Sequence, residues 1–296
     1  MAPPMLLDRE FLKTLEKVAL VCGNDLAGGV GSDHRSRERG SGLEFADYRG
    51  YSSGEDSRYL DWNAYLRLGK LFLKLYEAEQ NIRVYILLDC SASMDCEEAG
   101  ESKALYAQRL AATFAYLALL RLDTTVVIPF AERMGTPIIT AGGRNRFFSV
   151  LSFLSELTCE GRTDVYRSVQ GFLERFPSRG MVFVISDFFD EEGSNGAVQM
   201  LRSGGHDVVL IQVHSAEEQR PTMFGDFTLE DAESGAKQVV ACTPQSAALY
   251  ERAFLDASER LQRLVLRNGG RYARAVTSIP YQDFVLRSLQ TNRVLA

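Results

Sequence analysis

The chain has 296 residues, of which 46% are hydrophobic and 24% are charged, a composition typical of a globular protein with a sizeable apolar core. Its net charge of -6 gives no broad attraction to nucleic acid or to anionic lipid, so we expect protein partners and no nucleic acid. No stretch reaches about 18 uninterrupted apolar residues and the start of the chain carries charges, which predicts no membrane span, no secretory signal and a cytoplasmic protein.

Residues 1–80 are interpreted as an N-terminal extension that begins with an amphipathic helix over about residues 8–21. Its single tryptophan, Trp62, is interpreted as part of a local core that anchors the extension, because large aromatic side chains bury much area. The alternative is a recognition surface, since aromatic residues are enriched at binding hot spots. The other residues of this group are the aromatics Tyr48, Tyr51, Tyr59 and Tyr65, and the charged Asp56, Arg58 and Asp61, which are expected to pair beneath Trp62.

From residue 83 onward the sequence alternates between apolar strands and amphipathic helices, which is typical of an α/β protein with a mainly parallel sheet. The alternation predicts a doubly wound, Rossmann-type fold over residues 81–296. The expected strands are 83–89, 124–130, 136–139, 180–187, 207–213 and 272–276, and the expected helices are 103–121, 145–157, 165–176, 194–203 and 280–289.

An insertion at about residues 216–242 interrupts this alternation. Two short apolar runs, 227–229 and 238–240, flank the turn-forming residues Glu233, Ser234 and Gly235, which predicts a β-hairpin. Thr243 and Pro244 then have the cap-then-proline pattern of a helix start, and Gly269 and Gly270 indicate where that helix ends.

Oxygen-bearing side chains follow the apolar run 84–88 directly. Asp89, Ser91 and Ser93 alternate along a short turn, so their oxygens can point toward one position. Hard cations such as Mg²⁺ take oxygen ligands in a compact octahedron. These residues are therefore candidate ligands of a divalent cation, although a serine-rich turn that only caps a helix has the same pattern.

Two later segments add to this candidate site. Thr163 lies in a loop that opens a helix, where either it or Asp164 could cap free backbone N–H groups. Asp187 ends the apolar strand 180–187. Because the carboxyl ends of parallel strands line a common crevice in a doubly wound sheet, we expect Asp89 and Asp187 on one edge.

In these features the chain resembles the von Willebrand factor A-like fold and its metal-ion-dependent adhesion site. The three parts occur in the family's order: the D-x-S-x-S turn at Asp89, Ser91 and Ser93, then Thr163, then Asp187. The resemblance implies that Mg²⁺ or Mn²⁺ is held by the serine hydroxyls directly and by the two carboxylates through water, while Thr163 joins or leaves as its loop moves. Phe188 departs from the pattern, because many members have glycine after this aspartate.

A longer string resembles domain-of-unknown-function family 58. It comprises residues 44–49, Tyr51, residues 54–56, Arg58, residues 60–62, residues 69–71, Lys74 and residues 76–77. Members carry this segment just before an adhesion-site A domain, and many are encoded beside MoxR-type AAA+ ATPases. The resemblance implies a non-enzymatic adaptor that binds an acidic side chain of a client protein through its metal and works with such an ATPase. It also makes Asp56, Arg58, Asp61 and Trp62 possible docking residues.

Two other functions remain open. One is a metal-dependent phosphohydrolase in which Asp89 attacks phosphorus. That chemistry needs a second acid two residues further on, and Ser91 does not supply one near neutral pH. The other is a structural scaffold that binds no metal.

Overall fold

The computed structural model describes residues 6–17, 44–51, 60–77, 83–95, 101–121 and 123–288. The chain divides into two compact units, one of residues 1–27 with 82–296 and one of residues 28–81. The boundary after residue 81 lies one residue from the expected boundary at residue 80, but residues 1–27 group with the larger unit and not with the extension. The first helix, residues 9–17, belongs with the larger unit because Leu6, Leu7, Phe11 and Leu15 are buried in that unit's core.

The larger unit contains a six-stranded sheet whose strands follow the order β10-β7-β6-β3-β4-β5. Every neighbouring pair is parallel except β4 and β5 at one edge. The strands are β3 (Arg83–Asp89), β4 (Thr124–Phe130), β5 (Ile138–Thr140), β6 (Met181–Ser186), β7 (Asp207–His214) and β10 (Arg271–Val276). The predicted α/β class with a mainly parallel sheet is confirmed, and the observed strands match the expected ones to within two residues at either end.

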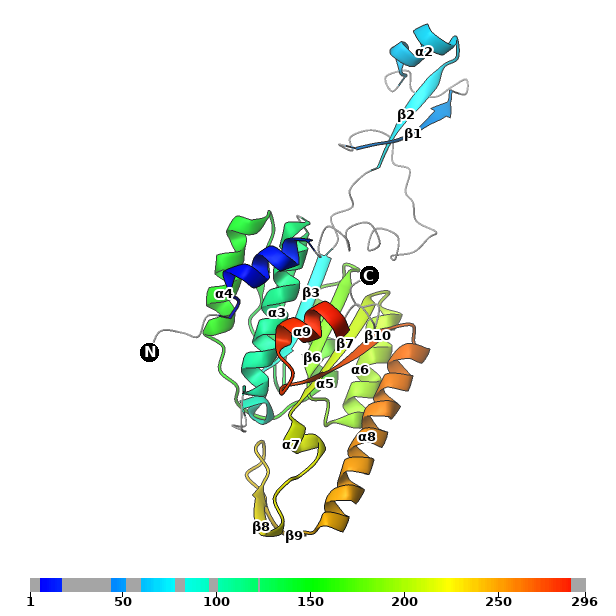
Figure 1. The fold of residues 1–296 in the computed structure, drawn as a ribbon. Helices are drawn as coiled ribbons and strands as arrows, with labels where there is room; N and C mark the ends of the chain where they lie inside the picture. Colours follow the sequence, from blue (N-terminus) through cyan, green and yellow to red (C-terminus); the bar gives the residue numbers. More distant parts are fainter. Residues whose placement is uncertain are drawn as a thin grey trace. The chain divides into compact units, whose positions relative to one another are not determined.

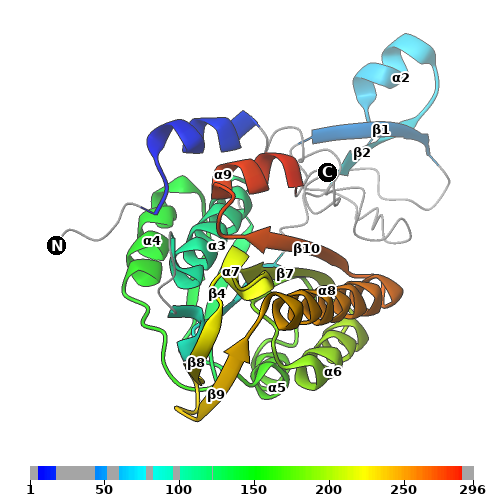
Figure 2. The same cartoon turned by 60° about the horizontal axis from the view of Figure 1, so that its bottom comes forward.

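Helices cover both faces of this sheet (Figures 1 and 2). Alternate residues of β3 show the two sides: Ile86 and Leu88 belong to one core cluster and Tyr85 and Leu87 to the other. This explains why the strand is apolar throughout. The first cluster includes helix 9–17, α3 (Lys103–Leu120), α4 (Phe147–Ser155) and α9 (Tyr281–Asp283), and the second includes α5 (Val165–Arg175), α6 (Glu191–Ser203) and α8 (Pro244–Arg267).

The insertion forms the predicted hairpin of β8 (Gly225–Glu230) and β9 (Lys237–Cys242). Phe227 pairs with Val240, so the expected runs 227–229 and 238–240 lie opposite each other. A short helix, α7 (Ala216–Gln219), precedes the hairpin, and α8 follows it with Thr243 as its N-cap and Pro244 in its first turn. Figure 1 shows α7 and the hairpin at the same end of the larger unit.

The smaller unit contains the antiparallel pair β1 (Glu44–Gly50) and β2 (Phe72–Glu77), with α2 (Trp62–Leu68) between them in sequence. The interpretation of Trp62 as part of a local core is wrong, because this side chain is 60% exposed. The reason is local: α2 has only seven residues and buries none of them, while the buried Asp61 faces inward and caps the N–H groups of Asn63 and Ala64. Asp56, Arg58 and Tyr59 lie outside the described residues.

Candidate functional site

Two carboxylates lie at the carboxyl ends of neighbouring strands. Asp89 is the last residue of β3, and Asp187 follows β6 directly. These strands pair in parallel through Leu88 and Ile185, so both carboxylates lie at one edge of the sheet, as predicted. Both side chains are almost fully buried, at 1% and 2% exposure.

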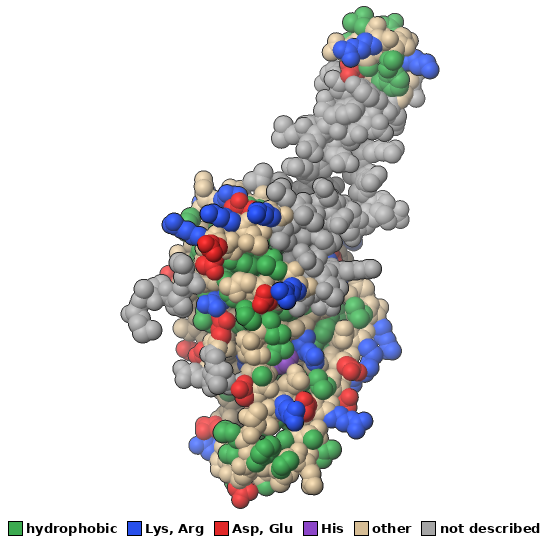
Figure 3. Space-filling model, in the orientation of Figure 1, with side chains coloured by type: hydrophobic (Ala, Val, Ile, Leu, Met, Phe, Trp, Pro, Cys, Tyr) green, Lys and Arg blue, Asp and Glu red, His purple; other side chains and the backbone are tan. Residues whose placement is uncertain are grey.

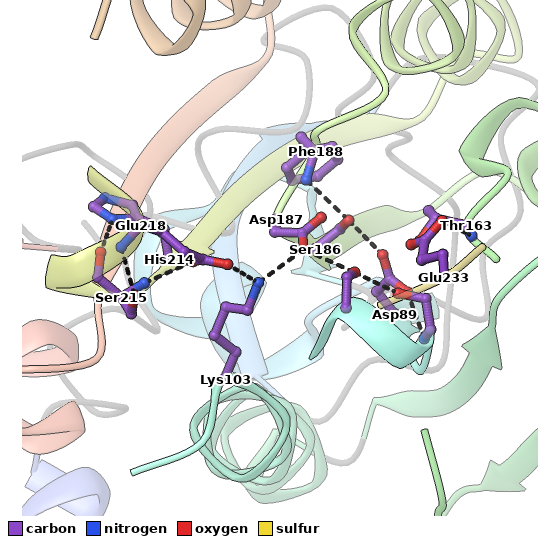
Figure 4. A network of polar contacts seen from close by, with 12 residues as sticks. Asp89, Lys103, Thr163, Ser186, Asp187, Phe188, His214, Ser215, Glu218 and Glu233 are labelled. Carbon is purple, nitrogen blue, oxygen red and sulfur yellow. Dashed lines mark hydrogen bonds and ion pairs between the residues drawn. The ribbon is translucent and has the colours of Figure 1, made fainter. Parts of the chain in front are cut away.

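A chain of hydrogen bonds joins four of the five predicted ligands. The Ser91 N–H donates to Asp89 Oδ1 at 2.9 Å, and the Ser91 and Ser93 hydroxyls are 3.0 Å apart. The Ser93 hydroxyl then donates to Asp187 Oδ2 at 2.9 Å. The turn after β3 therefore brings Ser93 to the aspartate that follows β6, the neighbouring strand in the sheet. Figure 4 shows Asp89 and Asp187 at this edge.

Thr163 reaches this edge through its loop. The Glu160 N–H donates to the Cys90 carbonyl at 2.9 Å and the Ala92 N–H donates to the Gly161 carbonyl at 3.0 Å, which ties the two loops together. The cap of α5 is Asp164, whose carboxylate accepts from the Arg167 N–H at 2.8 Å. Because Asp164 fills that role, the Thr163 hydroxyl does not cap α5, and it donates instead to Glu233 Oε1 at 2.8 Å.

Ser186 was not expected at the site. Its hydroxyl donates to Asp89 Oδ2 at 2.5 Å and accepts from the Phe188 N–H at 3.2 Å. Both oxygens of Asp89 thus accept hydrogen bonds, one from the Ser91 backbone and one from Ser186. The signal in the sequence was its position next to Asp187, at the end of the same apolar run.

Lys103, in the first turn of α3, is a second residue that the sequence analysis missed. Its buried ammonium group donates to Asp187 Oδ2 at 3.0 Å and also pairs with Glu218 of α7. Burial lowers the pKa of Lys103, but Asp187 and Glu218 more than offset this, so that its pKa is raised and its charged form is stable. No local pattern indicated this contact, because Lys103 is 84 residues away from Asp187 in sequence.

The electrostatics of the cluster favour an added positive charge. Burial, and then the negative charge of Asp187, raise the pKa of Asp89 to about 7. Lys103 pairs with Asp187 and Glu218, and the repulsion between Asp187 and Asp89 that raises this pKa is the interaction that an added cation would relieve. The side-chain atoms that the predicted ligand residues offer are all oxygens, and Mg²⁺ and Mn²⁺ prefer oxygen ligands. Within the described part of the chain no three His, Cys, Asp or Glu side chains form a group suited to a metal ion, so an ion here would depend on hydroxyls.

Phe188, which follows Asp187, has a backbone conformation that glycine adopts more readily than other residues. Its φ of 55° lies in the left-handed region, which costs most side chains about 1–2 kcal/mol. The ring is nevertheless buried in the core cluster that α5, α6 and α8 line. The turn after Asp187 is therefore the same kind of turn that glycine would make, held in place by packing of the aromatic ring.

This strain leads to a testable prediction. We expect Phe188→Ala to lower the free energy of unfolding by about 3 kcal/mol or more through the lost ring. Phe188→Gly loses the same ring but relieves the left-handed strain, so it is expected to be about 1 kcal/mol less damaging than Phe188→Ala. Urea denaturation of both variants gives the comparison, and Phe172, buried within α5, is the control site, where glycine should be worse than alanine. The same order at both sites would contradict the strain argument.

Comparison with known proteins identifies relatives of the chain as a whole. A family model described as "Protein of unknown function DUF58" matches residues 47–260. A protein of Mycobacterium tuberculosis (strain ATCC 25618 / H37Rv), described as uncharacterized, is 25% identical over 264 residues, which cover 85% of this chain and 81% of that protein. The family match therefore covers residues 47–81 of the smaller unit and five of the six strands of the larger sheet.

Solved structures with a similar fold include BatB from Bacteroides thetaiotaomicron, at 18% identity and a TM-score of 0.46 over 72% of this chain and 99% of that one. Another is an aerotolerance-related membrane protein from Bacteroides fragilis, at 18% identity and a TM-score of 0.43 over 71% and 98%. The SpRpn10 VWA domain matches at 10% identity and a TM-score of 0.39 over 71% and 95%.

The predicted cytoplasmic location is contradicted by this comparison. The Bacteroides fragilis chain is described as a membrane protein, and a further similar structure, from Vibrio fischeri, is described as a membrane spanning protein. We therefore withdraw the cytoplasmic prediction. Among the helices of the described residues, none combines the length and apolar character needed to cross a membrane.

Proposed function

Because the chain belongs to the DUF58 family, whose function is unknown, we propose its function from its own residues: it is a protein-binding module that depends on a divalent cation. The ligands would be Asp89, Ser91, Ser93, Thr163 and Asp187, and the cation Mg²⁺ or Mn²⁺. The observation that carries this proposal is the hydrogen-bonded series from Asp89 through both serines to Asp187 at one edge of the sheet.

The residues around the proposed metal site have separate roles in this proposal. The Ser91 N–H and Ser186 hydroxyl hold the Asp89 carboxylate in position. Lys103 compensates one buried negative charge on the side toward α7. The bound cation would supply a positive centre with a position open to a carboxylate. Among protein side chains, a carboxylate of a client protein is the group that such a centre attracts most strongly.

The geometry does not favour the phosphohydrolase alternative. A nucleophilic carboxylate must be reached by the phosphorus atom of its substrate, and the Asp89 side chain is only 1% exposed. Ser91, at the position where an acid would protonate the leaving group, is fully buried. We therefore propose no enzymatic activity. A scaffold that binds no metal remains an outcome of the binding experiment described in the Discussion.

The proposed physiological role is that of an adaptor for a MoxR-type AAA+ ATPase, which would remodel or mature the client that the adaptor binds. The support for this partner is the resemblance of residues 44–77 to the family signature. The exposed Trp62, Tyr65 and Leu66 of α2 lie in that segment and suit a docking contact. The metal site and α2 would then serve different partners.

A co-precipitation experiment tests this role. With the tagged full chain as bait, EDTA and Asp89→Asn are expected to reduce client capture to the same extent, and their effects should not add, because both remove one interaction. Association with the purified MoxR-type ATPase should persist in EDTA. Client capture that is indifferent to both treatments would contradict the metal-dependent mechanism.

A further inference from the structure

The hairpin carries a carboxylate to the predicted metal site. Glu233 accepts two hydrogen bonds from Thr163, one from its hydroxyl at 2.8 Å and one from its N–H at 3.2 Å (Figure 4). Glu233 is half-buried, whereas Asp231, Ala232, Ser234 and Gly235 around it are exposed. The tip of the hairpin therefore contacts the rest of the fold through this side chain.

The tip is shaped to present Glu233. Asp231 Oδ1 accepts from the Glu233 N–H at 3.1 Å, the Ser234 N–H at 2.6 Å and the Ser234 hydroxyl at 2.7 Å. Gly235 takes the left-handed conformation, with φ of 69°, that closes the turn. These bonds fix the backbone on both sides of Glu233, so its side chain is directed by the turn itself.

Apolar packing contributes little to the position of the hairpin, in which Phe227, Val240 and Cys242 are only partly buried. Met223, Phe224, Leu229 and Val239 are each more than half exposed. Figure 3 shows hydrophobic side chains gathered on the surface where Figure 1 draws β8 and β9. A two-stranded hairpin with its apolar side chains in solvent is only marginally stable by itself. The contact of Glu233 with Thr163 therefore anchors the tip of the hairpin to the loop before α5.

We propose that Glu233 is an internal occupant of the position that a client's carboxylate takes. This inference rests on the proposed function, since Thr163 is one of the five proposed ligands. In this arrangement the chain closes its own site, and a client binds by displacing the hairpin tip. The tip also indicates the chemistry of the client. We expect the client to present a glutamate or aspartate from a tight turn, so that its carboxylate can reach Thr163.

The test uses the full chain with Mn²⁺ and measures the relaxation rate of water protons, which reports water bound to that ion. We compare wild type, Glu233→Ala and the matched control Glu230→Ala, which removes a carboxylate from the same hairpin but one that pairs with Lys237. Glu233→Ala should raise the relaxation rate by admitting water where the carboxylate was. Acetate at millimolar concentrations should then reverse this rise.

In wild type and Glu230→Ala the response to acetate should be at least about tenfold weaker, because the tethered carboxylate has a high effective concentration. If Mn²⁺ binds all three proteins and they respond equally to acetate, Glu233 is not the occupant, although the metal site stands. If Mn²⁺ binds none of them, the metal site itself is wrong and the inference about Glu233 fails with it.

Discussion

Replacing Asp89 with asparagine is expected to weaken Mg²⁺ binding at least about 100-fold, since removal of groups that only support metal ligands already costs 10- to 100-fold. Asparagine keeps an oxygen that can accept from the Ser91 N–H, so the turn after β3 should persist. The variant loses the negative charge while the arrangement of Ser91 and Ser93 is retained. Titration calorimetry of the full chain measures this affinity.

Asp95→Asn is the matched control for this experiment. Asp95 lies in the same loop, six residues after Asp89, but its side chain is exposed. Its substitution should leave Mg²⁺ affinity within about twofold of wild type, because exposed charges interact weakly with the site. Equal losses in both variants would indicate a nonspecific effect of charge. If wild type binds no Mg²⁺ or Mn²⁺, the scaffold alternative is favoured.

The second large effect is expected at Lys103. Lys103→Met leaves the buried Asp187 and the largely buried Glu218 without their cation, and breaking a buried ion pair in this way costs about 3–5 kcal/mol. The free energy of unfolding in EDTA should fall by that amount. Mg²⁺ should stabilise this variant more than it stabilises wild type, because the ion replaces the lost positive charge and binds the folded state.

Arg109→Met is the control on the same helix. Arg109 pairs with Glu101 at 2.6 Å, but both side chains are partly exposed, at 24% and 19%. Such a pair contributes only about 0–1 kcal/mol. Urea denaturation of both variants, each with EDTA and with Mg²⁺, separates the cases. A Lys103→Met variant no less stable than Arg109→Met would show that the contacts of Lys103 with Asp187 and Glu218 add little to the fold.

Much of the fold was predictable because its signals are local. The apolar run of β3 ends at Asp89, and that of β6 ends directly before Asp187, so both the strands and their terminal carboxylates follow from short windows of sequence. The same holds for the hairpin, where two short apolar runs flank a turn. Parallel pairing then brings Asp89 and Asp187 to one edge, which alternation of strands and helices already implied.

Exposure was harder to predict, and Trp62 shows the reason. Its size favoured a buried position, but burial depends on whether another layer covers the helix that carries it. None of the seven residues of α2 is buried. Asp61, which precedes Trp62 and is the N-cap of this helix, is buried. Residue type sets how much a side chain would gain by burial, and only the packing of its surroundings decides whether burial occurs.

The sequence by itself determined the α/β fold and the strand ends, because both depend on neighbours within a few residues. From the same local patterns it predicts Asp89, Ser91, Ser93, Thr163 and Asp187 as metal ligands. Only the tertiary structure decided which other side chains contact these five residues. Lys103 reaches Asp187 across 84 residues and Glu233 reaches Thr163 across 70. No periodicity encodes such pairs, since they arise when helices and loops pack on the finished sheet. The ammonium group of Lys103 affects the charge of the site, and the carboxylate of Glu233 affects access to it. The positions of both groups depend on the complete tertiary structure.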